Sequence, residues 1–192
     1  MNYYSEALKQ LVPSEISWVS TGNSHKWLSE VADDTTLPTK EEIVQKAAEL
    51  EYQEEVNEYQ RQRAAEYPSY ANQFDKIFHE GVDAWKADIQ ATKDKYPKAT
   101  MDATELQTRK DKAIFDLQTE RYVAATKRLE LDAVVASDDI PATVEVSTTN
   151  PETMEVTTET VPNPVIVKDE EERAAAQAVV DATPQPVIDS LG

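Results

Sequence analysis

A proline that interrupts a helical apolar pattern is the strongest constraint on what this chain can fold into. The residue before a proline is driven out of helical backbone geometry, so a helix must end at Tyr67-Pro68. Beyond Pro68, large apolar side chains recur every three or four residues, which is the spacing of one helix face. They are Phe74, Ile77, Phe78, Val82, Trp85 and Ile89. The chain is therefore predicted to be mainly α-helical, with prolines separating its helices.

The composition argues against one large hydrophobic core. Of the 192 residues, 40% are hydrophobic and only 7% are aromatic. Three glycines leave few tight turns, and ten prolines divide the chain into segments. We therefore expect either one domain or a small domain with appendages.

Charge and cysteine content exclude several classes of protein. The formal net charge is −18, with 37 acidic against 19 basic side chains and no run of Lys or Arg. Such a chain repels nucleic acid and anionic membranes, so neither is an expected partner. The absence of Cys excludes disulfides, thiolate zinc sites and cysteine nucleophiles, and it suits a reducing cytoplasm. The sequence shows neither the pattern of a signal peptide nor the run of about 20 apolar residues that spans a bilayer.

Residues 1–37 are predicted to form a small N-terminal mixed module. A short apolar helix face is closed by Pro13, and residues 16–20 alternate apolar and polar side chains as a half-buried strand does. Residues 21–23 supply turn chemistry, and residues 26–28 return as a second strand. Because a two-stranded hairpin is marginal alone, we expect it to pack on a helix or on another chain.

Residues 38–136 are predicted to be a helical region in which three long helices form a hairpin or bundle. The predicted spans are about 40–65, 70–94 and 103–134. Thr39 and Glu42 have the spacing of a capping box, which fixes the start of the first helix. In the third helix, apolar side chains repeat every seven residues on well-separated faces, which calls for more than one neighbour.

Residues 137–192 are predicted to be an extended acidic tail, rich in Pro, Thr and Val, with a short helix at about 170–182. The segment has twelve acidic residues against Lys168 and Arg173, and no aromatic residue follows Tyr122. It therefore cannot bury enough surface to offset its ordering entropy by itself. We expect it to be ordered in an assembly, by basic side chains of neighbours or by strand addition to an exposed sheet edge.

No catalytic, cofactor-binding or metal-binding residue is predicted. His79-Glu80-Gly81 begins like a metalloprotease helix, but Asp83 stands where the second histidine is needed, and two ligands do not make a site. A metal-dependent hydrolase that uses His79 is therefore the least favoured function. The many carboxylate pairs are interpreted as a solvated face, because no pair is marked as buried. Gly81 indicates either a close helix crossing or a tolerated exposed position.

The candidates for a partner interface are large aromatic and aliphatic side chains on predicted strand and helix faces. They are Trp18, Trp27, Phe74, Phe78, Trp85, Phe115, Tyr122 and Leu129. The spacing of the first five favours packing in a core over a ligand platform. The side chains of Phe74, Ile77, Phe78, Trp85 and Ile89 are predicted to share one buried stripe. Truncation of Phe78 or Trp85 to Ala would then cost about 3–5 kcal/mol.

Two parts of the chain resemble a module found in small tail and tail-fibre proteins of tailed bacteriophages. Residues 61–97 carry the resemblance best, through Tyr-Pro-Ser, Gln-Phe-Asp, Phe-His-Glu-Gly, Trp85 and a closing Tyr-Pro. Residues 16–43 carry it weakly, through Lys-Trp-Leu and Pro-Thr-Lys-Glu-Glu-Ile. Together they cover about a third of the chain, and the resembled proteins imply no catalytic residue.

The resemblance implies a non-enzymatic virion structural protein of a tailed phage, in the tail or at the attachment of its fibres. Such a protein is made in the host cytoplasm and acts by protein–protein interaction. Its partners would be other tail or tail-fibre proteins, in an oligomeric or multi-chain assembly. The alternative is a tail-fibre assembly chaperone, which binds the fibre polypeptide transiently and then leaves.

Overall fold

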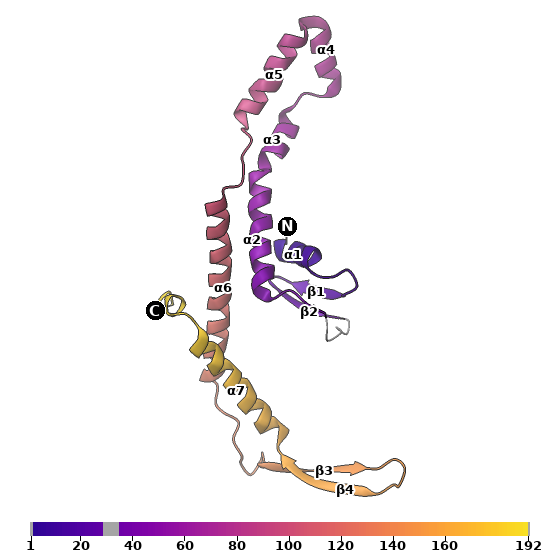
Figure 1. Cartoon of the computed structure of the whole chain (residues 1–192), viewed down its shortest axis with the longest axis vertical. Helices are drawn as coiled ribbons and strands as arrows, with labels where there is room; N and C mark the ends of the chain where they lie inside the picture. Colours follow the sequence, from indigo (N-terminus) through magenta and orange to yellow (C-terminus); the bar gives the residue numbers. More distant parts are fainter. Residues whose placement is uncertain (1, 29–34, 192) are drawn as a thin grey trace. The chain divides into compact units, whose positions relative to one another are not determined.

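A computed structural model describes residues 2–28 and 35–191 and is shown in Figure 1. The chain is mainly α-helical, as predicted. It divides into two compact units, Met1–Ile114 and Phe115–Gly192. The boundary lies within helix α6 (Ala103–Glu130), so that this helix contributes residues to both units.

The first unit begins with the predicted small helix and two-stranded hairpin. Helix α1 (Tyr3–Leu11) is capped by Asn2, whose side chain accepts a hydrogen bond from the backbone N–H of Ser5 at 3.2 Å. Strands β1 (Trp18–Thr21) and β2 (Ser24–Trp27) pair antiparallel, with Trp18 opposite Trp27. The prediction of a helix plus hairpin is therefore confirmed.

The core of the first unit forms where α1 packs on helix α2 (Lys40–Val56). Its buried residues are Tyr4, Ala7, Leu8, Val12, Ile16 and Ile43. The two tryptophans of the hairpin lie partly buried against this cluster, so the hairpin packs on a helix as expected. The capping box is also present: Thr39 caps α2 and the Glu42 carboxylate accepts from the Thr39 backbone N–H at 2.8 Å. Capping residues next to each helix in the sequence thus determine where both helices of this core begin.

The single helix predicted over residues 40–65 is divided at Asn57 in the structure. Helix α3 (Glu58–Glu66) starts after it. The Asn57 side chain accepts a hydrogen bond from Gln60 at 3.2 Å, and asparagine competes in this way with regular helix backbone bonding. The end before Pro68 is where it was predicted, since Tyr67 has extended backbone angles.

The single helix predicted over residues 70–94 is wrong, because the chain reverses at Gly81. Helix α4 (Tyr70–Glu80) and helix α5 (Val82–Lys95) are folded back on each other (Figure 1). Gly81 has φ 89° and ψ 168°, a region of backbone space that is essentially restricted to glycine. Apart from Gly81 and its two chain neighbours, no residue places a heavy atom within 4 Å of where a Cβ would stand, so Gly81 is a turn and not a close helix crossing.

Replacing Gly81 with Asn is expected to destabilise the α4–α5 hairpin by about 1–3 kcal/mol, because Asn does not tolerate this backbone region. Gly22, in the turn between β1 and β2, offers a matched control. Its φ of 59° is that of the left-handed helical conformation, which Asn adopts readily. Hydrogen exchange of α4 and α5 amides is expected to accelerate in Gly81→Asn and to stay unchanged in Gly22→Asn. Equal effects of the two substitutions would contradict the assignment of Gly81.

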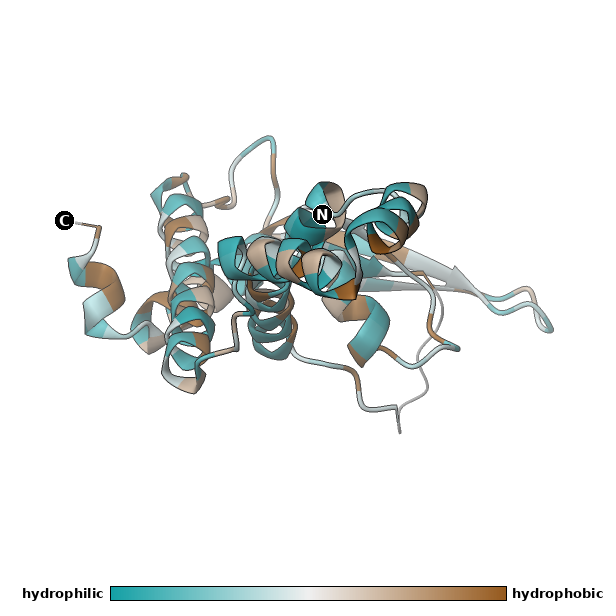
Figure 2. Ribbon diagram, turned by 90° about the horizontal axis from the view of Figure 1, so that it is seen from above, coloured by the Kyte–Doolittle hydropathy of each residue, from teal (hydrophilic) through white to brown (hydrophobic). Residues whose placement is uncertain are grey.

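The second unit contains residues 115–130 of α6, a second hairpin and two further helices. Strands β3 (Thr143–Thr149) and β4 (Val156–Pro162) pair antiparallel and are almost wholly exposed on both faces. They are followed by helices α7 (Pro164–Ala182) and α8 (Gln185–Asp189). Figure 2 shows apolar residues, in brown, interspersed with polar ones along the helices. This agrees with the composition of the chain, which argues against one large hydrophobic core.

The structure differs from the predicted extended tail over residues 137–192. The hairpin and a helix of 19 residues replace most of it, and the helix starts earlier than the predicted 170–182. The early start has a local cause that sequence analysis missed. The Asn163 side chain accepts from the Val165 N–H at 3.0 Å, and Pro164 stands at the first helical position, where its missing N–H has no cost.

Candidate interaction surface

Trp18 and Trp27 pack against the core of the first unit. His25, on strand β2, lies with its ring centroid 4.4 Å from that of Trp27, and its Nδ1 is 2.8 Å from the Tyr4 hydroxyl. Burial lowers the pKa of His25, and the positive charge of Lys40 lowers it further. The His25 ring thus packs on Trp27, and both tryptophans are partly buried against the core of the first unit.

Trp85 holds the α4–α5 hairpin together from the inside. Its indole N–H donates to the Gln73 side-chain oxygen at 3.0 Å, and Lys76 pairs with Asp88 across the same interface. Ile77 and Ile89 are half-buried there as well. The inner face of the hairpin is thus made by one part of the predicted apolar stripe.

The base of the hairpin is closed by residues at the ends of α3 and α5. The Arg63 guanidinium donates to the carbonyls of Tyr96 at 2.8 Å and Lys93 at 3.1 Å, which are orphan acceptors at the C-terminal end of α5. Glu66 pairs with Lys95 at 2.7 Å and accepts from the Tyr96 hydroxyl at 2.6 Å. We call residues 63–96 the helical arm. Sequence analysis missed this closure, although the paired Tyr-Pro motifs at 67–68 and 96–97 mark it.

Three aromatic side chains on α4 are directed to solvent. Tyr70, Phe74 and Phe78 are 81%, 69% and 82% exposed, and they follow one another at intervals of four residues on one helix face. We call these three residues the aromatic stripe. Val82, at the start of α5, is about half exposed beside them in sequence.

The aromatic stripe corrects the prediction of one buried apolar face. In a continuous helix, Phe74 and Phe78 would share a face with Trp85 and Ile89. Because the chain reverses at Gly81, α5 covers only one side of α4, and the two phenylalanines stay outside. The predicted cost of about 3–5 kcal/mol for truncating Phe78 therefore does not apply to this chain by itself. Tyr70 was not among the predicted interface residues, although its spacing from Phe74 indicates the same face.

The three candidates on α6 are each half-buried: Phe115, Tyr122 and Leu129. The most buried side chains of this helix are instead Leu117 and Ala125, at 3% and 6% exposure. Of the eight predicted interface residues, only Phe74 and Phe78 present most of their surface to solvent.

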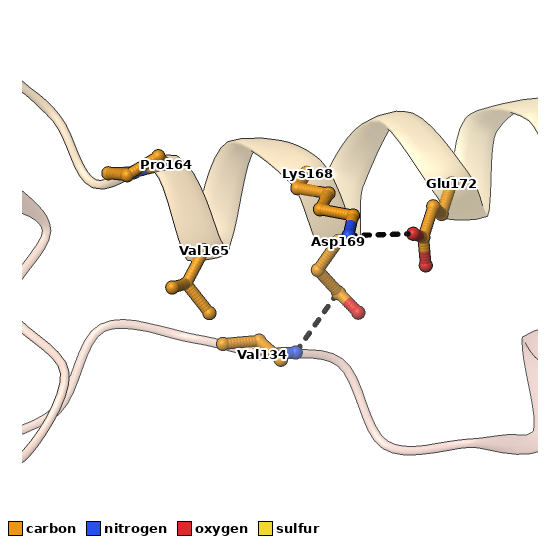
Figure 3. Close-up of a pocket in the computed structure, with 6 residues that line it drawn as sticks. All are labelled: Val134, Pro164, Val165, Lys168, Asp169 and Glu172. Atoms are coloured by element: carbon orange, nitrogen blue, oxygen red, sulfur yellow. Dashed lines mark hydrogen bonds and ion pairs between the residues drawn. The ribbon is translucent and has the colours of Figure 1, made fainter.

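A shallow pocket in the second unit lies between the start of α7 and the connector that follows α6 (Figure 3). Its lining residues are Val134, Pro164, Val165, Lys168, Asp169 and Glu172. Asp169 is nearly buried, accepts from the Val134 backbone N–H at 3.0 Å and pairs with Arg128 of α6. The Arg128 guanidinium lowers the pKa of the Asp169 carboxyl, and the Val134 N–H adds to this effect. The carboxylate is thus engaged in holding α7.

The histidine motif does not assemble a metal site. His79 lies on exposed α4 and is 3.4 Å from Asp75, whereas Asp83 lies beyond the reversal at Gly81. Within residues 2–28 and 35–191, no group of three or more metal-ligating side chains is placed to hold an ion. In the same ranges no helix combines the length and the apolar character that crossing a bilayer requires.

No protein-family model matches the sequence, and neither a curated protein nor a solved structure matches it. The candidate function therefore depends on the surface of the chain and on the residues that carry the resemblance.

Proposed function

We propose that this protein is a non-enzymatic structural component of a tailed-phage virion, located in the tail or at the attachment of its fibres. It acts by binding other tail or tail-fibre proteins. The observation that supports the proposal is the aromatic stripe, which lies within residues 61–97, the segment that most resembles phage tail and tail-fibre proteins.

Two properties of the aromatic stripe favour a role in interaction: its exposure to solvent, and the ordered helical arm that carries it. Large contiguous apolar patches on a protein surface mark interaction sites, and aromatic side chains are enriched in interface cores. Hydrogen bonds and ion pairs at the base of the helical arm and between its helices hold the stripe in place. A surface that is already ordered loses less conformational entropy on binding.

The test is the composition of purified virions of the phage that encodes the chain. Quantitative mass spectrometry is expected to find the protein at a fixed copy number that survives washing in high salt. The alternative, a tail-fibre assembly chaperone, also needs an exposed apolar surface. A chaperone would be present in the infected lysate and absent from the particles, and that result would overturn the structural role.

A further inference from the structure

The aromatic stripe is not needed for the packing of the arm itself. The contacts between α4 and α5 include those of Trp85 with Gln73 and of Lys76 with Asp88, on the inner face of the hairpin. Phe74 and Phe78 stay largely exposed after these contacts are made. The stripe is therefore available to a partner without any rearrangement of the arm.

Charge distinguishes the arm from the rest of the chain. Residues 63–96 contain five basic and six acidic side chains, so they carry a net charge of about −1 out of −18. Two copies of so acidic a chain repel each other over most of their surface, but not along the arm. A basic partner would instead be drawn to the strongly acidic segments, such as residues 137–192. The near-neutral arm thus favours a second copy as the occupant of the stripe.

The stripe is also complementary to itself. Its three rings stand one turn apart, at a rise of about 6 Å per four residues. When two stripes lie antiparallel across a twofold axis near Phe74, each Tyr70 faces the partner copy's Phe78 position. The neighbouring Ala71 and Asn72 carry no charge, and an oxygen of the Asp75 carboxylate lies 3.4 Å from Nε2 of His79. A self-complementary patch of this kind is what an isologous dimer requires.

We infer that the aromatic stripe pairs with the stripe of a second copy of the chain, antiparallel and across a twofold axis near Phe74. The inference rests on the proposed function, because it names a partner for the same surface. Three rings on each copy bury an area at the low end of specific interfaces, below about 1,200 Å² in total. The dimer is therefore dependent on protein concentration.

Sedimentation equilibrium of the full chain, from about 5 to about 500 µM, measures the association directly. The wild-type chain is expected to pass from monomer to dimer, and Phe78→Ser to raise the dissociation constant about tenfold or more. Because Phe78 is exposed, the variant keeps its helical circular dichroism. Leu28→Ser is the matched control, since Leu28 is an exposed apolar residue on the N-terminal hairpin and its loss leaves association unchanged. Raising NaCl from about 0.05 to about 0.5 M does not weaken the dimer, because it screens repulsion between acidic chains.

Cysteine cross-linking tests the antiparallel register, since the chain has no cysteine of its own. Phe74→Cys, close to the axis, is expected to form a disulfide dimer with itself. Tyr70→Cys and Phe78→Cys are expected to cross-link when the two variants are mixed, and not when either is alone.

A monomer over the whole concentration range overturns the inference, and so does a dimer that Phe78→Ser leaves intact. Cross-linking of Tyr70→Cys with itself contradicts the antiparallel register. A monomer in solution that is nevertheless present in purified virions separates the two proposals, because the structural role then stands and its partner is another protein.

Discussion

Replacing Ile43 with Ala is expected to lower the free energy of unfolding of the first unit by about 2–5 kcal/mol. Ile43 is fully buried where α2 meets α1, and Leu8 is equally buried in the same cluster. Its truncation leaves a cavity that neighbouring side chains fill only in part. Since small domains are stable by only about 5–15 kcal/mol, this is a large share of the total. Urea unfolding followed by tryptophan fluorescence measures the loss, because Trp18 and Trp27 pack against this cluster.

Two exposed residues provide controls for the Ile43 prediction. Leu28 is 62% exposed at the end of the N-terminal hairpin, and Leu28→Ala is expected to change stability by less than about 0.5 kcal/mol. Phe78→Ala is expected to leave the unfolding of the monomer equally unaffected. A loss at Phe78 as large as that at Ile43 would show that the stripe is a core face, as the sequence pattern suggested.

The boundaries that sequence analysis predicted correctly depend on residues close together in the chain. Thr39 and Glu42 form their capping box within one helical turn, and Tyr67-Pro68 ends α3 through local sterics. Gly22 reverses the N-terminal hairpin, for which turn chemistry and strand alternation are both visible in sequence. Short-range stereochemistry decides each of these features, so the sequence is sufficient.

The reversal at Gly81 could not be predicted in the same way, because the apolar period continues through it. Phe78, Val82 and Trp85 keep helical spacing whether or not the helix is continuous. What decides the outcome is the pairing of residues on the two sides of the turn, such as Gln73 with Trp85. The same apolar residues are thus divided between an inner face and the exposed aromatic stripe, which the sequence pattern alone does not separate.

Helix α7 could not be predicted in full for a related reason. Asp169 begins a run of four acidic residues, and such a run is normally a solvated face. In the structure its carboxylate is nearly buried and is paired with Arg128, a residue 41 positions earlier in the chain. Composition describes the average of this segment, whereas long-range contacts, such as that of Asp169 with Arg128, determine how the helix is held.

Replacing Asp169 with Asn is expected to release α7 from the end of α6. The carboxylate accepts from the Arg128 guanidinium and from the Val134 N–H, whereas an amide has one acceptor oxygen, no charge and two donor hydrogens. One donor is then left without its partner at a nearly buried position, which is costly. Hydrogen exchange across residues 164–182 is expected to lose its protection, and the second unit to lose much of its helical circular dichroism.

Glu171→Gln is the matched control, because it removes the same charge from an exposed position on the same helix and is expected to change neither measurement.

The Asp169 contact also gives α7 a dependence on acid. Because Arg128 lowers the folded-state pKa of Asp169, its stabilisation is present above the ordinary aspartate pKa of 3.8 and is lost as the pH falls through the lower folded-state value. In Asp169→Asn this acid-induced loss is expected to be absent. If α7 kept its protection in Asp169→Asn, or if Glu171→Gln removed it equally, the Asp169 contact would not be what holds the helix.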